Sequence, residues 1–199
     1  MGEKYSMVSV PKEGSNPGMP QGKKEILIVF DFSKFQMTRD EKGVKVTALT
    51  AIDGTSKPIG LFMNPASVDA GDEVEGDAYA RGFIHHVNFD HPGTELAVAE
   101  FKANNVNNPL GAIIVPCDSA VSTAKVYGTP CAPLMMQQGQ EQDTNEAHNN
   151  HFELRTQSRT WPVGIIDKTG IPATDNAEIN AYLGLTVQAG DEVHDGDGV

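Results

Sequence analysis

Cysteine and basic residues are scarce in this chain, and each shortage excludes a class of function. Among 199 residues there are two cysteines, Cys117 and Cys131, with no CxxC pair and no zinc-finger spacing of Cys and His. We expect two buried or semi-buried thiols. The 15 Lys and Arg residues are outnumbered by 27 Asp and Glu, giving a formal net charge of -12. That charge disfavours binding to nucleic acid or to an anionic membrane, because both attract mainly basic surfaces.

The chain also lacks a long apolar run. Its longest, residues 25–32 and 110–115, are far shorter than the roughly 20 residues that span a bilayer. The first residues contain no apolar core of a secretory signal. We therefore expect no membrane partner, and a site of action inside a cell or in a particle assembled there.

Sequence motifs of catalysis and nucleotide binding are missing as well. Neither the Walker pattern nor Gly-x-Gly-x-x-Gly occurs, and no Gly-x-Ser-x-Gly elbow surrounds Ser119 or Ser122. Cys117 with one of the six histidines is the alternative nucleophile, but Pro116 and the apolar residues before it favour a structural thiol. We predict that the chain is not an enzyme, with no catalytic residues and no cofactor.

The densest group of metal-binding residue types lies between His85 and His91. On a strand, His86 and Asp90 share one face but stand about 13 Å apart at roughly 3.3 Å per residue, too far to share one ion. His85 faces the other side, and His91 would return only through a turn. We assign no metal site here and expect histidines paired across a sheet or at a subunit interface. The alternative is a metal-dependent enzyme in which His86, Asp90 and His91 converge.

Two other polar segments contain residue types that bind metals. His148 and His151, with Glu146 and Glu153 nearby, would share a face of a helix, but the Gln- and Asn-rich surroundings favour an exposed loop. The segment 191–198 resembles a fragment of a calcium loop without the spaced ligands and terminal Glu of an EF-hand. We interpret it as a solvated acidic end.

Glycine and proline are abundant, with 20 and 12 residues, while hydrophobic residues make up 39%. This composition favours short strands joined by turns. We predict a mainly β (α+β) fold, a β-sandwich or barrel with one or two short flanking helices and extended arms. Residues 1–24 are predicted to form an N-terminal arm and residues 25–187 a single β-rich domain with a long polar loop at about 136–150. Residues 188–199 are predicted to form an acidic C-terminal tail.

Alternation of apolar and polar residues locates the elements of this domain. We predict strands at residues 25–32, 44–51, 58–63, 79–90, 110–117, 125–127 and 152–160, with 161–166 continuing past a kink and 185–187 strand-like. An acidic loop is predicted at residues 69–77. Helix formers after Thr94 predict a helix over residues 95–103 with Thr94 as its N-cap, and a second helix is predicted over residues 174–183, closed by Gly184.

The order of these elements resembles that of phage tail tube proteins, whose subunits stack as rings into the tube of a virion tail. The resemblance covers about residues 25–167. It includes two strands and a loop, followed by the strand Arg81-Gly-Phe-Ile-His-His-Val-Asn-Phe89, a helix after Pro92-Gly93, and Ala112-Ile-Ile-Val115. It continues with Lys125-Val-Tyr-Gly-Thr129, Ala132-Pro-Leu134 and the late strands around Phe152 and Trp161.

That resemblance implies a viral structural protein that self-assembles, six subunits to a ring, with strands of neighbouring subunits forming one β-lined channel. Its partners would be copies of itself and other virion proteins, and DNA would pass without specific binding. It would be located in the virion, after assembly in the host cytoplasm. The negative charge would repel DNA in the channel, and residues 1–24 and 136–150 would bind neighbouring rings.

Two other functions fit the same sequence. One is a different virion component, such as a head decoration or connector protein, with the same β-rich and arm-bearing character. The other is a monomeric carbohydrate-binding module of β-sandwich fold, using Trp161 and nearby tyrosines as stacking surfaces. With one Trp and four Tyr, such a stacking surface is small, and Trp161 beside Pro162 favours packing in the core or at a strand edge.

Overall fold

The chain folds mainly into β-strands, as its short apolar runs predict. The computed structural model describes residues 9–10 and 22–185. These residues form eleven strands, two α-helices and one short 3-10 helix, a mainly β α+β fold that confirms the predicted class. The strands are β1 (Lys23–Asp31), β2 (Phe35–Arg39), β3 (Lys45–Ala51), β4 (Ile59–Phe62), β5 (Asp69–Glu75), β6 (Gly82–Pro92), β7 (Leu110–Pro116), β8 (Thr123–Tyr127), β9 (Leu134–Asp143), β10 (His148–Thr156) and β11 (Gly164–Asp167). The α-helices are α1 (Leu96–Asn105) and α2 (Ala177–Leu183).

A first sheet contains seven strands in the order β2-β3-β11-β8-β7-β1-β4. Its pairs are antiparallel except for β11 with β3. The central strand β7 is buried from Leu110 to Val115, with apolar residues on both of its faces. Burial on both faces explains why this segment is continuously apolar in the sequence.

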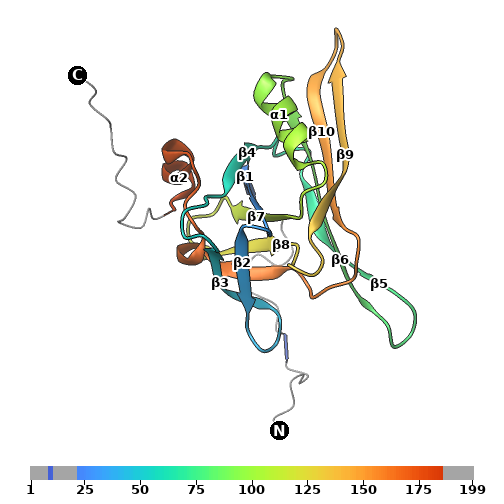
Figure 1. Ribbon diagram of the computed structural model, residues 1–199, viewed down its shortest axis with the longest axis vertical. Coiled ribbons are helices and arrows are strands. Elements are labelled where there is room, and N and C mark those ends of the chain that lie inside the picture. Colours follow the sequence, from blue (N-terminus) through green and yellow to red (C-terminus); the bar gives the residue numbers. More distant parts are fainter. Residues whose placement is uncertain (1–8, 11–21, 186–199) are drawn as a thin grey trace, which may run out of the picture.

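A second sheet consists of four antiparallel strands in the order β9-β10-β6-β5. It runs along one side of the molecule, with the β9–β10 turn and the β5–β6 turn projecting at opposite ends (Figure 1). Its inward face carries Val87 and Phe89 of β6 and Phe152 and Leu154 of β10, all fully buried. The opposite face is polar.

The two sheets are joined by one register pair, Leu110 of β7 with Leu134 of β9. One hydrophobic core fills the space between the sheets and includes Phe89, Phe152 and Tyr127. A second core lies on the other side of the first sheet, where β1, β3 and β11 pack with Leu183 of α2. The first sheet is therefore covered on both faces, as Figure 1 shows from the positions of α2 and of β9–β10 on either side of it.

Both helices cover edges of these cores. Helix α1 inserts Val98 and Phe101 into the core between the sheets. It begins at Leu96 without a side-chain cap, so the N-cap predicted at Thr94 is wrong; the Thr94 hydroxyl lies 3.1 Å from Nε2 of His148 instead. Helix α2 is capped by the Asn176 side chain and closed by Gly184, where φ is 72°. The glycine at that end confirms the predicted stop signal.

Two segments predicted as loops are strands. Residues 69–77 contain β5, and residues 136–150 contain most of β9 and the start of β10. Outside the core, the β9–β10 hairpin is held by Lys102 of α1, whose Nζ donates to Oε2 of Glu141 at 2.8 Å and to Oδ1 of Asn150 at 2.6 Å. Asn150 also donates to the Gly93 carbonyl at 2.8 Å, so this fully buried amide is satisfied on both sides.

Strand β2 was not predicted, although Phe35 and Met37 alternate with Gln36 and Thr38 as in a half-buried strand. The predicted strand at 185–187 is wrong at Leu185, which follows α2 without strand pairing. Most of the predicted arm, and the whole tail at 188–199, lie outside the described residues. Lys23 and Lys24, assigned to the arm, belong to β1.

Candidate functional surface

The outward side of the second sheet is mainly polar, apart from Ile84 and Met135, and we call it the polar face. Residues directly opposite each other in an antiparallel pair share a face, so the register assigns its members. They are Asp69, Glu73 and Glu75 of β5, His86, Asn88 and Asp90 of β6, His151, Glu153 and Arg155 of β10, and Gln138, Gln140 and Gln142 of β9. Five carboxylates and one arginine give this set a formal charge of -4 with neutral histidines.

Contacts between polar side chains connect three strands across the polar face. Arg155 lies 3.0 Å from Oε1 of Glu75 and 3.9 Å from Glu73. The His86 ring lies 3.7 Å from Asp69 and 3.6 Å from Glu73. These cross-strand pairs fix the register of an edge strand that contributes little to the core.

The shortest contact on this face joins His151 to Asp90, with Nδ1 and Oδ1 separated by 2.6 Å. Glu153 lies 3.4 Å from Nε2 of the same ring. The hydrogen bond to Asp90 raises the pKa of His151, because the charged imidazolium is the stronger donor. The carboxylate-rich face therefore favours a proton on His151.

His85 is the neighbour of His86 but points the opposite way, as strand geometry predicts. It is fully buried, with Nε2 at 2.8 Å from the carbonyl of Trp161 and Nδ1 accepting from the Gly128 N–H at 2.9 Å. These two partners place the single proton on Nε2. Burial lowers the pKa of His85, so the ring is neutral and acts as a structural link between β6 and two loops.

The metal-binding alternative needed His86, Asp90 and His91 to converge. Asp90 contacts His151, and Nδ1 of His91 contacts the Phe62 carbonyl at 2.8 Å, so the three side chains have separate partners. Within residues 9–10 and 22–185, no three His, Cys, Asp or Glu residues are arranged to hold a metal ion. His148 and His151, predicted in a loop, lie on strand β10 and contact Asp143 and Asp90.

The other candidate residues are dispersed over the surface. Cys117 and Cys131 are free and exposed, which overturns the expected buried or semi-buried thiols. Cys117 directly follows β7, and Cys131 lies in the turn between β8 and β9. Ser119 and Ser122 are exposed in the connection between β7 and β8. Aromatic residues proposed for carbohydrate stacking lie on different elements: Tyr127 is buried in β8, while Tyr182 lies on α2 beneath Lys24.

Two free edges flank the polar face. Strand β5 pairs with β6 alone, and β9 beyond Leu134 pairs with β10 alone, among the described residues. The edge of β5 carries Val74 with 60% of its surface exposed. An unpaired edge presents backbone donors and acceptors that another strand can use.

Sequence reasoning missed this surface because β5 was interpreted as a loop. The signal was present: Ala70 and Val74 alternate with Asp69, Glu73 and Glu75, as in a half-buried strand. Comparison of the chain with protein-family models, curated proteins and solved structures found no match. In the part of the chain that the structure describes, neither helix is long and apolar enough to cross a membrane.

Proposed function

We propose that the chain is a structural subunit that joins with copies of itself into rings and tubes, as phage tail tube subunits do. The observation that carries this proposal is the second sheet, whose acidic polar face lies between two edges, β5 and β9, that are unpaired among the described residues. Pairing β5 of one copy with β9 of the next removes both edges and repeats around a closed ring.

The bulk of the molecule decides which face lies inside such a ring. The core, the first sheet and α2 lie on the inward side of the second sheet and occupy the wider outer circumference. The polar face then lines the channel. Its carboxylates repel a passing polyanion, which keeps DNA from adhering to the wall.

The β9–β10 hairpin supports a second contact in the same assembly. Its exposed residues from Gln137 to Asp143 extend past the core and end in a polar turn (Figure 1). In a stack of rings, we infer that this projecting hairpin contacts the next ring. The hairpin thus takes the role of binding neighbouring rings, which was first expected of a loop at 136–150.

Negative-stain electron microscopy of the purified chain tests the proposal, with rings or tubes as the expected result. Val74→Lys places a charge on the free edge of β5 and should prevent ring formation while the monomer remains folded by circular dichroism. Ile52→Lys is the matched control, since Ile52 is 64% exposed just after β3, a strand of the first sheet. A wild-type chain that stays monomeric at high concentration would sink the proposal.

A further inference from the structure

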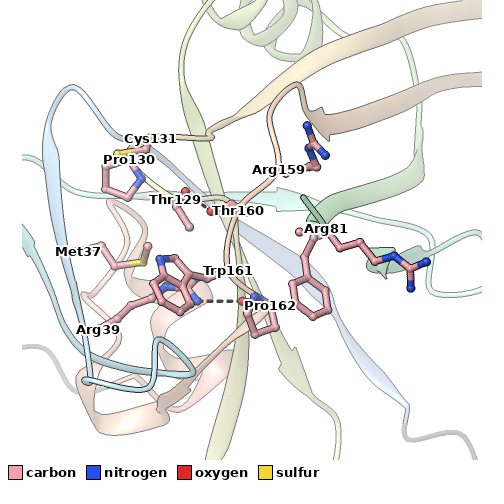
Figure 2. Close-up of a pocket in the computed structure, with 12 residues that line it drawn as sticks. Met37, Arg39, Arg81, Thr129, Pro130, Cys131, Arg159, Thr160, Trp161 and Pro162 are labelled. Carbon is pink, nitrogen blue, oxygen red and sulfur yellow. Dashed lines mark hydrogen bonds between the residues drawn. The ribbon is translucent and has the colours of Figure 1, made fainter. Parts of the chain in front are cut away.

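Three of the four arginines in this acidic chain line one pocket. The pocket has a volume of about 650 Å³ and lies where the end of β2, the start of β6 and the segments 129–131 and 159–162 meet (Figure 2). Arg39, Arg81 and Arg159 contribute the charge, and Phe83, Trp161 and Pro162 contribute apolar surface. Such a concentration of cations is unexpected in a chain with a net charge of -12.

No Asp or Glu is among the described residues that line this pocket. The carboxylate next to Arg39 in the sequence, Asp40, is already used: its Oδ1 accepts from the backbone N–H of Val44 at 2.9 Å and of Lys45 at 3.0 Å. The three guanidinium groups are therefore not neutralised by carboxylates of the pocket wall.

Arg39 is the most deeply placed of the three. Its Nη1 donates to the carbonyls of Gly43 at 2.8 Å and Pro162 at 2.9 Å, which fixes the side chain. Its Nε and Nη2 are buried and have no hydrogen-bond partner among the residues that the structure describes. Burial lowers the pKa of Arg39, because the cation is removed from water. An oxyanion would supply the acceptors that these buried donors lack.

Arg81 and Arg159 lie on the exposed side of the pocket. Arg159 donates to the Ala80 carbonyl, and Arg81 has no hydrogen bond or ion pair to a described residue. In Figure 2, Arg81 and Arg159 lie on one side of Trp161 and Pro162, and Arg39 lies on the other side. The cations therefore flank the apolar surface of the pocket. Positive charges that are spread in this way match several carboxylates along an extended peptide better than they match one compact anion.

We propose that this pocket binds an acidic peptide segment, with its carboxylates on the three arginines and its backbone across Phe83, Trp161 and Pro162. The binding is a property of the single subunit and does not depend on tube formation. The chain itself contains such a segment in Asp191, Glu192, Asp195 and Asp197, which lie outside the described residues. This segment, in the same chain or in a second copy, is the occupant, and an acidic segment of another protein is the alternative that the test distinguishes.

The test uses a synthetic peptide with the sequence of residues 189–198, titrated into the full-length chain. Trp161 is the single tryptophan and lines the pocket, so its fluorescence should change on binding. Cys131 also lines the pocket and is exposed, so the peptide should slow its alkylation by iodoacetamide; Cys117, exposed outside the pocket, is the internal control.

Variants locate the site. Arg81→Gln with Arg159→Gln should raise the Kd about tenfold, equal to about 1.4 kcal/mol. The control is Lys34→Gln with Lys125→Gln, which removes the same charge at exposed positions outside the pocket and should leave the Kd unchanged. Three results would each overturn the proposal. One is equal binding of a peptide with Asn and Gln in place of Asp and Glu, and another is equal loss of affinity in both double variants. The third is no binding of the peptide either to the wild type or to a full chain whose own acidic segment is neutralised.

A variant of the full chain with Asn or Gln at positions 191, 192, 195 and 197 identifies the source of the segment. If the chain's own segment occupies the pocket, this variant should bind the peptide more tightly than the wild type, because competition is removed. Equal affinity of the two chains would assign the pocket to an acidic segment of another protein. Both results require the peptide to bind through Arg81 and Arg159.

Discussion

The buried histidine makes the stability of this fold sensitive to pH. His85 is fully enclosed, accepts from Gly128 through Nδ1 and donates to Trp161 through Nε2. A second proton would require Nδ1 to become a donor facing the Gly128 N–H, and it would place a charge in the core. The folded state therefore resists protonation, while the unfolded chain accepts a proton at the ordinary pKa of 6.5.

The size of the effect follows from this difference. The pKa of His85 is lowered in the folded state, so protonation favours the unfolded chain and stability falls as the pH drops below 6.5. Between pH 7.5 and 5.5, a histidine that titrates only when unfolded removes up to about 1.4 kcal/mol from the free energy of unfolding. A smaller loss in the free energy of unfolding would mean that the His85 ring is also protonated in the folded state within this pH range.

His85→Phe isolates this contribution from those of the other titrating groups. At pH 7.5 the variant should be less stable by about 2–5 kcal/mol, because it leaves a buried N–H and a carbonyl without partners. At pH 5.5 the difference from wild type should shrink by up to about 1.4 kcal/mol, since the phenyl ring does not titrate. Urea unfolding at both pH values measures the two differences.

The control for this experiment is His148→Phe, the same exchange at an exposed position. It should change the free energy of unfolding by no more than about 0.5 kcal/mol at pH 7.5. If the difference between His85→Phe and the wild type is the same at both pH values, the folded ring titrates like the unfolded one. The assignment of a neutral, doubly hydrogen-bonded His85 would then be refuted.

Two further predictions concern the second sheet. Phe152→Ala should lower the free energy of unfolding, measured by urea titration, by about 3–5 kcal/mol. The Phe152 ring is fully buried, and its centroid lies 5.2 Å from that of the stacked Phe89 ring and 5.7 Å from that of the edge-on Phe101 ring. A loss below about 1 kcal/mol would contradict this packing. Asp90→Asn should lower the pKa of His151, which NMR titration measures. It should also reduce the stabilisation that the raised pKa of His151 gives the folded state. In the wild type this stabilisation is fully present below pH 6.5 and is lost as the pH rises through the pKa of His151 in the folded state. An unchanged pKa would show that Glu153, and not Asp90, holds the proton.

Strands with a regular apolar pattern were predictable from the sequence, and strands without one were not. Strand β7 is apolar throughout because both faces are buried, and β6 alternates because one face is polar. Strand β9 has seven exposed residues from Gln137 to Asp143, so no periodic pattern marks it. Its conformation depends on pairing with β10 and on Lys102 of α1, which local sequence does not reveal.

The pocket was not predictable for a related reason. Arg39, Arg81 and Arg159 come from three distant parts of the chain, and only the folded sheets bring them together. Burial of His85, by contrast, had a signal in the sequence, because it shares a strand face with Phe83, Val87 and Phe89. The hydrogen-bond partners of its ring, Gly128 and Trp161, come from two loops distant in the sequence, which only the fold brings to His85.

The pairing of β1 with β7 has a consequence for how the chain is made. The apolar run Leu27-Ile-Val-Phe30 of β1 pairs with β4 on one edge, but its other edge stays free until β7 is present, where the register joins Asp31 to Leu110. At a synthesis rate of 5–20 residues per second, the first strand waits roughly 4–16 s for its partner. During that interval the free edge of this β-forming segment is open to pairing with other nascent chains. During synthesis, β1 is therefore the segment that most needs protection by chaperones, because it is the first part of the domain to leave the ribosome.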